Sequence, residues 1–316
     1  MALDPDTKEW LVKVFGSNVR FDESMSRHTS LGVGGPAEAF VVPENHDELV
    51  ELINWSRQKA LPYLVIGDGT NLLVKDSGLS GIVIVLTKCL KTITQLDKGD
   101  SSVTVTAMAG VRMQTLCRFA IEHGLEGMNF ALGIPGTVGG GIMMNAGTDR
   151  GSIEDVLDSI KVLLPMGMIK TIGKDELNFG YRELSFSQGK TDVYQGQPII
   201  LDGSFRLHLK DSGELKKEAE LILKNRRKSQ PTGGLSAGCF FKNPESGKTA
   251  GELIELAGLK GKRKGGAQIS PKHANFIINT GQASASDFLA LMELVQETVI
   301  TMFNIDLKPE VKIVGE

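Results

Sequence analysis

Along most of the chain, two hydrophobic periods alternate, and this predicts strands interleaved with helices. Short apolar runs and period-two alternation predict strands at residues 37–42, 64–66, 81–86, 102–107, 156–172 and 198–209. Apolar positions three and four residues apart predict helices at 47–59 and 111–123, and Gly124 suits the end of the second helix. The first two thirds of the chain therefore combine α and β structure.

The last third has a different character. A charged segment at 214–228 and an amphipathic segment at 285–303 predict two helices, and residues 308–314 predict a final strand. No period of about 20–50 residues repeats. At 316 residues the chain exceeds the size of one ordinary core, so we expect three lobes, with boundaries near residues 92 and 210.

Charge and cysteine content narrow the class of partner. A formal net charge of −3 provides no general attraction for nucleic acid or an anionic membrane, which favours a small-molecule partner. The three cysteines are far apart and odd in number, which argues against a disulfide framework. The first residues lack the pattern of a signal peptide, and the apolar run 82–86 is too short to span a membrane. We therefore expect a cytoplasmic protein.

The segment 133–147 is the most informative part of the chain, because it holds six glycines. Glycine lacks a Cβ and permits positive φ, so backbone amides can converge on a phosphate or on the edge of a flat ring. A flexible linker would be polar and rich in serine, whereas Ile, Val and Met interrupt this run. The segment predicts a nucleotide or flavin cradle.

Several other motifs lack the context that their chemistry requires. Residues 32–37 fit a dinucleotide fingerprint only nominally, because a strand-like sequence follows them instead of a helix. Residues 247–249 imitate the end of a P-loop, but Lys242 stands where its first glycine belongs. The five histidines are scattered, so we expect no metal site. The basic runs 224–228 and 260–264 could meet diphosphate oxygens, although solvated faces explain them as well.

Three further residues could carry chemistry together. Cys239 lies between a small turn and two aromatic residues, and a thiol can donate a proton, although a buried structural cysteine is the simpler interpretation. Residues 179–182 are predicted to lie in a loop between the strands at 156–172 and 198–209, and Arg182 there could hold a carboxylate in a bidentate pair. Glu310 could donate or relay a proton. Taken alone, Arg182 is explained as a surface salt-bridge residue and Glu310 as a residue of an edge strand. The set as a whole suits chemistry on an α,β-unsaturated acid.

At this point the chain resembles the UDP-N-acetylenolpyruvoylglucosamine reductase family of flavoenzymes, in the subgroup that lacks a tyrosine-bearing capping loop. The resemblance covers roughly residues 20–314. The matching segments are His28-Thr29-Ser30 with Gly34-Gly35, then residues 67–73, 133–147, 179–182, 236–244, 250–254, 258–261, 273–276 and 309–311.

The resemblance implies an α+β chain with the vanillyl-alcohol-oxidase (PCMH-type) FAD-binding fold of two lobes and a C-terminal α+β substrate-binding domain. The lobes correspond to residues 1–92 and 93–210, and the substrate-binding domain to 211–316. No histidine or cysteine pattern indicates a covalent flavin, so FAD is expected to be non-covalent. The residues implied to bind FAD are Gly67, Gly69, Thr70, Asn71, Leu72, Gly133, Pro135, Gly136, Thr137, Gly139, Gly140, Asn145, Ala146 and Gly147.

The family reaction is the reduction of UDP-N-acetylglucosamine enolpyruvate to UDP-N-acetylmuramate in peptidoglycan precursor synthesis. NADPH gives a hydride to FAD and leaves, and the substrate then takes a hydride at C3. The resemblance implies that Arg182 and Glu310 stabilise the developing enolate-like carboxylate, and that Cys239 protonates C2. It also implies substrate contacts from Tyr181, Arg227, Gln230, Lys242, Asn243 and His273. We expect a monomer.

The chain departs from the family pattern at two catalytic segments. Many members have serine at the position of Cys239, and a thiol is the more acidic of the two groups. The family sequence Tyr-Arg-Asp-Ser is represented by residues 181–184, Tyr-Arg-Glu-Leu, which keep the arginine.

Two other functions fit parts of the pattern. An FAD oxidase or dehydrogenase of the same fold could act on an alcohol, a hydroxy acid or a sugar lactone, but it would need a base rather than a proton donor. A flavin-binding or nucleotide-binding module without chemistry would not need Arg182, Cys239 and Glu310 together. Dependence on NADPH separates the first alternative from the reductase.

Overall fold

The computed structural model describes residues 3–98, 101–164, 167–186, 198–231 and 235–315. The chain divides into two compact units, and each has its own hydrophobic core. The first unit contains Met1–Phe21, Ala39–Asp68 and Gly81–Lys224, and the second contains Asp22–Glu38, Gly69–Ser80 and Asn225–Glu316.

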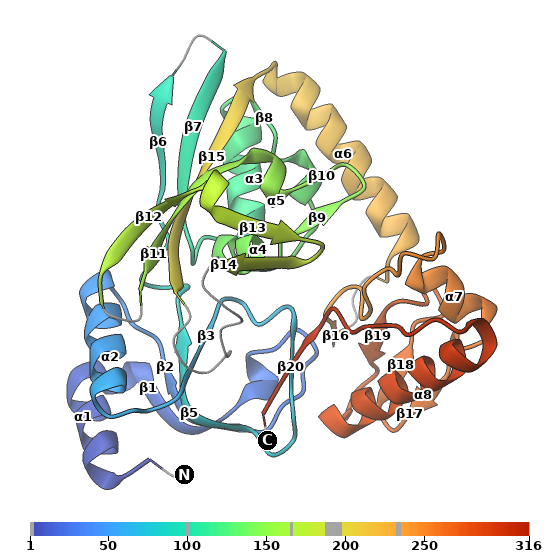
Figure 1. The fold of residues 1–316 in the computed structure, drawn as a ribbon, viewed down its shortest axis with the longest axis horizontal. Helices are drawn as coiled ribbons and strands as arrows, with labels where there is room; N and C mark the ends of the chain where they lie inside the picture. Colours follow the sequence, from blue (N-terminus) through green and yellow to red (C-terminus); the bar gives the residue numbers. More distant parts are fainter. Residues whose placement is uncertain (1–2, 99–100, 165–166, 187–197, 232–234, 316) are drawn as a thin grey trace. The chain divides into compact units, whose positions relative to one another are not determined.

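The larger unit is built on two sheets (Figure 1). One sheet has the strand order β1 (Val19–Ser24), β2 (Pro36–Val41), β5 (Leu79–Val85), β3 (Tyr63–Ile66), and its residues 22–24, 36–38 and 79–80 belong to the smaller unit. The other has the order β12 (Ile169–Gly173), β11 (Leu157–Leu163), β15 (Ile199–Leu209), β7 (Ser102–Met108), β6 (Ile93–Lys98), and β8 (Leu125–Glu126) also pairs with β15. Two small ribbons pair β9 (Gly147–Thr148) with β10 (Gly151–Ser152), and β13 (Leu177–Gly180) with β14 (Glu183–Phe186).

The helices of this unit are α1 (Pro5–Phe15), α2 (His46–Gln58), α3 (Met113–Glu122), α4 (Val138–Met143), α5 (Ile153–Val156) and the greater part of α6 (Ser212–Ser229). Short 3₁₀ turns occupy Gly16–Asn18, Asn129–Ala131 and Lys174–Glu176 in this unit, and Met25–Arg27 in the smaller unit. Helix α4 packs against β15, the long central strand of the larger sheet.

Side-chain alternation explains how β7, the neighbour of β15, packs in that sheet. Val103, Val105 and Ala107 are buried and their neighbours are half-buried, so one face of the strand packs on the core. In the antiparallel register, Val105 pairs with Phe205 and Val103 pairs with Leu207. These cross-strand apolar pairs stabilise the sheet.

The smaller unit contains one four-stranded sheet and two helices. Its strand order is β16 (Leu235–Ser236), β19 (Ile277–Asn279), β18 (Ala267–Ile269), β17 (Arg263–Lys264), and the helices are α7 (Ala250–Leu256) and α8 (Ala285–Phe303). Helix α8 packs against β17 and β18. A parallel pair of short strands, β4 (Leu72–Val74) and β20 (Lys312–Val314), completes the unit.

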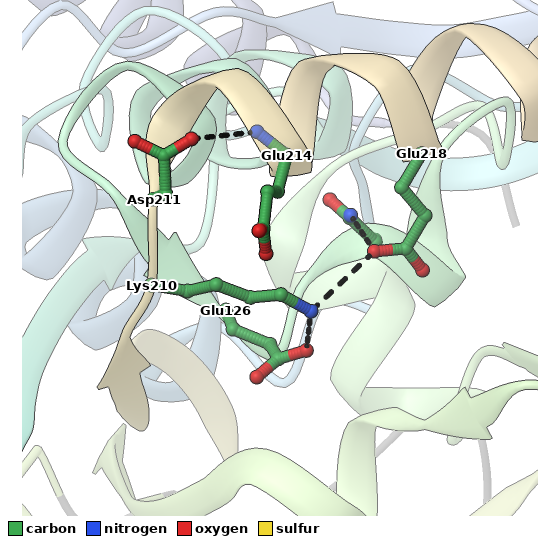
Figure 2. A network of polar contacts seen from close by, with 6 residues as sticks. Glu126, Lys210, Asp211, Glu214 and Glu218 are labelled. Atoms are coloured by element: carbon green, nitrogen blue, oxygen red, sulfur yellow. Dashed lines mark hydrogen bonds and ion pairs between the residues drawn. The ribbon is translucent and has the colours of Figure 1, made fainter.

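A polar network holds the start of α6 on the larger unit (Figure 2). The Asp211 carboxylate accepts a hydrogen bond from the Glu214 N–H at 2.9 Å. Lys210 forms ion pairs with Glu126 and Glu218, and the Asn129 amide donates to Glu218 at 3.0 Å. The network therefore connects α6 to β8 and to the 3₁₀ turn at Asn129–Ala131.

Most predicted elements are present, and three predictions need correction. The helix at 285–303 has the predicted ends, and α3 ends before Gly124, whose φ is 64°. The predicted strand at 156–172 is a hairpin of two strands, β11 and β12. The predicted strand at 308–314 begins only at Lys312, because Pro309 has no N–H for a ladder and forms an isolated bridge instead. Residues 179–182, predicted as loop, belong to the β13–β14 hairpin.

The predicted division into 1–92, 93–210 and 211–316 concerns function and stays a prediction. The structure places most of the first two segments in one unit with the start of α6, and joins residues 22–38 and 69–80 to the C-terminal segment.

Candidate functional site

The glycine-rich segment folds around the short helix α4. Thr137 caps the helix, because its hydroxyl accepts a hydrogen bond from the Gly140 N–H at 3.4 Å. Val138 and Ile142 are buried, as expected for apolar residues inside the run. A Cβ on Gly139 would lie 2.8 Å from the Cβ of Ala109. This glycine therefore permits close packing within the protein.

Other positions in the same segment offer free backbone donors. Gly136 has φ of 106°, and both Pro135 and Gly140 are exposed. No described residue accepts a hydrogen bond from the N–H of Gly136 or of Thr137, although their carbonyls are used by Met113 and Gly141. Two neighbouring donors without a protein acceptor suit an anionic ligand oxygen.

The loop after β3 passes beside this segment. A Cβ on Gly67 would overlap the Thr137 hydroxyl, so the two backbones lie in close contact. Asp68 is paired with Arg112, whose Nε lies 3.2 Å from its carboxylate. Within the described chain, the N–H groups of residues 67–70 have no acceptor. The residues present therefore fit a phosphate-containing cofactor, which backbone amides can bind without a basic side chain.

The rest of this loop belongs to the smaller unit and has a structural role as well. Gly69 has φ of 61°, and its carbonyl accepts from Ser30 at 3.1 Å. Asn71 donates from its side-chain amide to the Glu310 carbonyl at 3.1 Å, and its own carbonyl accepts from Lys312 at 3.0 Å. Asn71, predicted to bind FAD, thus also holds the backbone of a predicted catalytic residue.

Arg182 lies in the turn of the β13–β14 hairpin with φ of 59°, a conformation uncommon for residues other than glycine. Its guanidinium donates to the Gly147 carbonyl at 2.7 Å and lies 5.0 Å from the centre of the Tyr181 ring. The buried Asn145 donates to the Gly180 carbonyl at 3.2 Å. The end of the glycine-rich segment therefore positions the arginine.

Cys239 and Glu310 lie on neighbouring chain segments of the smaller unit. The Glu310 N–H donates to the Phe240 carbonyl at 2.8 Å, and the Lys242 N–H donates to the Lys308 carbonyl at 2.8 Å. Phe241 and Pro309 form an antiparallel bridge between these bonds. Both Cys239 and Glu310 are partly exposed. The structure thus brings together two of the three predicted catalytic residues, and Arg182 belongs to the other unit.

Of the six predicted substrate contacts, Tyr181 lies in the larger unit and five lie in the smaller one. Arg227 and Asn243 are exposed, and the Asn243 carbonyl oxygen accepts from the Ala250 N–H at 3.0 Å. Gln230 directly follows α6, and Lys242 is half-buried. His273 is half-buried, and desolvation lowers its pKa below the ordinary value, which favours the neutral imidazole.

Sequence reasoning missed one residue at this site, Asn275. It is buried, and its side chain forms hydrogen bonds with both the N–H and the carbonyl of Phe241. The motif His273-Ala274-Asn275-Phe276 was a signal, because it was part of the family resemblance and its Asn275 had no assigned role.

Comparisons with known proteins bear on the whole chain. A family model described as FAD binding domain matches residues 37–173, and one described as UDP-N-acetylenolpyruvoylglucosamine reductase, C-terminal domain, matches residues 230–314. The chain is similar to the UDP-N-acetylenolpyruvoylglucosamine reductase of Desulfosudis oleivorans, with 46% identity over 314 residues, 99% of this chain and 100% of the relative. The chain belongs to the UDP-N-acetylenolpyruvoylglucosamine reductase family.

Further relatives of this family agree. The reductase of Pelobacter propionicus is 44% identical, over 93% of this chain and 95% of that protein. The crystal structure of the reductase from Thermus caldophilus has a TM-score of 0.76 and 35% identity, over 94% of this chain and 98% of that one. The predicted family, the FAD-binding fold and FAD as cofactor are confirmed.

Among the residues described, no group of three or more His, Cys, Asp and Glu side chains could hold a metal ion. No helix in the described part of the chain has the length and apolar character needed to cross a membrane.

Proposed function

We propose that this chain catalyses the NADPH-dependent reduction of UDP-N-acetylglucosamine enolpyruvate to UDP-N-acetylmuramate, a step of peptidoglycan precursor synthesis and thus of cell wall biogenesis. Family membership along the full chain supports the reaction. The observation that carries it is the hydrogen bond from Glu310 to Phe240, which places two candidate acids, Cys239 and Glu310, on adjacent segments.

FAD, when bound, supplies the hydride relay between NADPH and the substrate. The unpaired amides of residues 67–70 and of Gly136 and Thr137 are its proposed ligands, since they can neutralise phosphate oxygens without a cation. The predicted contacts from Gly133, Gly139, Gly140 and Ala146 belong to the same proposal.

The proposed role of Arg182 is to pair with the substrate carboxylate. Addition of hydride at C3 of the enolpyruvyl group converts the C=C bond into a carbanion at C2, whose charge spreads into the carboxylate. A fixed guanidinium stabilises that charge, because it is already oriented before the reaction. The bond from Arg182 to the Gly147 carbonyl supports this orientation.

Cys239 is the proposed donor of the proton that C2 takes up. Its thiol proton forms the new C–H bond, the electron pair of the carbanion is consumed, and the thiolate then regains a proton from solvent. Glu310 stabilises the same enolate-like state from the neighbouring segment. Tyr181, Arg227, Gln230, Lys242, Asn243 and His273 are proposed contacts for the sugar and the uridine diphosphate.

We further propose that the enzyme acts as a monomer in the cytoplasm, where its nucleotide-linked substrate and NADPH are both present. Sedimentation of the purified holoenzyme at micromolar concentration tests the first point, since a dimer would double the mass.

The flavin absorbance of the purified protein tests the reaction directly. Under anaerobic conditions, NADPH should bleach the oxidised band, and UDP-N-acetylglucosamine enolpyruvate should restore it. A band that returns only when oxygen is admitted would favour the oxidase alternative. Absence of flavin together with failure to bind added FAD would refute the cradle.

A further inference from the structure

Asn275 is a buried polar side chain of the smaller unit, and both of its polar atoms are hydrogen-bonded. Only 3% of its surface is exposed. Its side-chain carbonyl accepts from the Phe241 N–H at 2.9 Å, and its side-chain amide donates to the Phe241 carbonyl at 2.8 Å. The side chain thus pairs with Phe241 as the edge of a neighbouring β-strand would.

Backbone bonds extend this pairing to the segment that carries Glu310. The Phe240 N–H donates to the Asn275 carbonyl at 2.7 Å, and the Phe240 carbonyl accepts from Glu310 at 2.8 Å. Residues 240 and 241 are therefore held between residue 275 on one side and residues 309–310 on the other. Cys239 directly precedes this clamped pair.

Few side chains could replace Asn275. Pairing with both the N–H and the C=O of one residue requires a donor and an acceptor on a short planar group, which asparagine provides. Loss of the carbonyl or of the amide of the Asn275 side chain would leave the Phe241 N–H or carbonyl without a hydrogen bond in a buried environment, which destabilises the fold. The segment after Cys239 would then be free to shift.

We propose that Asn275 is a positioning residue for the protonation step: through Phe241 it fixes Cys239 relative to Glu310. This inference rests on the proposed function, since it assigns to Cys239 the proton that reaches C2. A shift of about 1 Å in a reacting group can cost on the order of 10²-fold in rate. The effect of Asn275 should therefore appear in the substrate half-reaction and not in the reduction by NADPH.

The first test compares the two half-reactions of Asn275→Ala in stopped flow. We expect reduction by NADPH to stay within about twofold of the wild type and reoxidation by substrate to slow by at least about tenfold. Equal slowing of both half-reactions, or reoxidation at the wild-type rate, would overturn the proposal.

The second test uses Asn275→Asp and keeps the shape of the side chain. A protonated carboxyl can accept from the Phe241 N–H and donate to its carbonyl, whereas a carboxylate can only accept. Burial raises the pKa of such a carboxyl group. Relative to the wild type at each pH, reoxidation by substrate should recover as pH falls. If the ratio of the variant's reoxidation rate to that of the wild type does not change with pH, the two hydrogen bonds to Phe241 do not have the proposed role.

The matched control is Asn279→Ala in the same unit. The Asn279 amide donates to the Leu31 carbonyl at 3.0 Å and its oxygen accepts from Gly281 at 2.8 Å, with no bond to residues 239–242 or 308–310. Its half-reactions should match the wild type. If the flavin of the wild-type protein is not reoxidised by substrate, the proposed function is wrong. If the wild-type flavin is reoxidised and the Asn275 variants react at the same rate, the positioning role is wrong.

Discussion

Arg182 donates a hydrogen bond from its guanidinium to the carbonyl of Gly147, at 2.7 Å. Gly147 ends the glycine-rich segment, and Arg182 occupies the turn of a hairpin 35 residues later. The proposed flavin cradle and the proposed carboxylate-binding arginine are therefore parts of one structure. This contact explains how a residue in a strained turn keeps its side chain in a fixed direction.

Arg182→Lys should weaken the substrate half-reaction while sparing the reduction by NADPH. Lysine keeps the charge but loses the planar fork that can bond both a carbonyl and a carboxylate. We expect reoxidation by substrate to fall on the order of 10- to 100-fold. Arg206→Lys, which alters an arginine paired with Asp158 on the same unit, should leave both rates unchanged. Equal rates of reoxidation by substrate in the two variants would show that Arg182 does not bind the substrate carboxylate.

Cys239→Ser should retain activity within about tenfold, whereas Cys239→Ala should lose on the order of 10² or more in substrate reoxidation. Serine can deliver a proton, and alanine cannot. Cys89→Ala is the control, because burial raises the pKa of the Cys89 thiol to about 11 and no catalytic role is proposed for it. Full activity of Cys239→Ala would show that another group protonates C2.

Glu310→Gln should slow reoxidation by substrate by a factor on the order of 10². The backbone bonds of residue 310 to Phe240 and Asn71 do not involve the carboxyl group, so the fold should persist. Glu245→Gln, an exposed change in the same unit, serves as the comparison. Single-turnover measurements that give equal rates for the two variants would refute the role of Glu310.

Two glycines in the cradle should respond differently to alanine. A Cβ on Gly67 would overlap the Thr137 hydroxyl, so Gly67→Ala should destabilise the fold by about 1–3 kcal/mol. A Cβ on Gly140 would meet only the Thr137 hydroxyl at 3.6 Å, so Gly140→Ala should leave stability unchanged or raise it by about 0.5–1 kcal/mol. Urea unfolding of the apoprotein measures both. If Gly140 contacts the cofactor, Gly140→Ala should bind FAD more weakly than the wild type although its fold is no less stable.

Asp76 should make folding stability depend on acid pH. Desolvation raises its pKa, but hydrogen bonds from Ser286 and Ala285 at the start of α8 outweigh that effect and lower it below 3.8. A lowered folded-state pKa means that the stabilisation is complete above about pH 3.8 and is lost as pH falls through the folded-state pKa.

Asp76→Ala should therefore cost about 1 kcal/mol at neutral pH, as a lost helix cap does, and flatten the decline of stability below pH 4. Urea unfolding between pH 3 and 7 measures the difference. Parallel curves for variant and wild type would show that Asp76 does not contribute through its charge.

Local patterns in the sequence determined much of the fold. Amphipathic periodicity located α8 with both of its ends, and alternation located β7, because these elements bury one face and are long enough for the period to be visible. Strands of two or three residues, such as β16 and β17, leave no period to recognise. The glycine-rich motif and the ordered matches to the family were sufficient to predict FAD and the reductase family.

The tertiary structure alone decided which of the predicted site residues lie on neighbouring segments and which residues hold those segments. Cys239 and Glu310 are adjacent through bonds between segments about 70 residues apart, and periodicity carries no information on such pairings. The glycines looked equivalent in sequence, yet Gly139 packs against Ala109 while Gly136 leaves its amide without a protein acceptor. Asn275 was visible as part of a motif, but its role depends on two hydrogen bonds to Phe241, which only the folded chain forms.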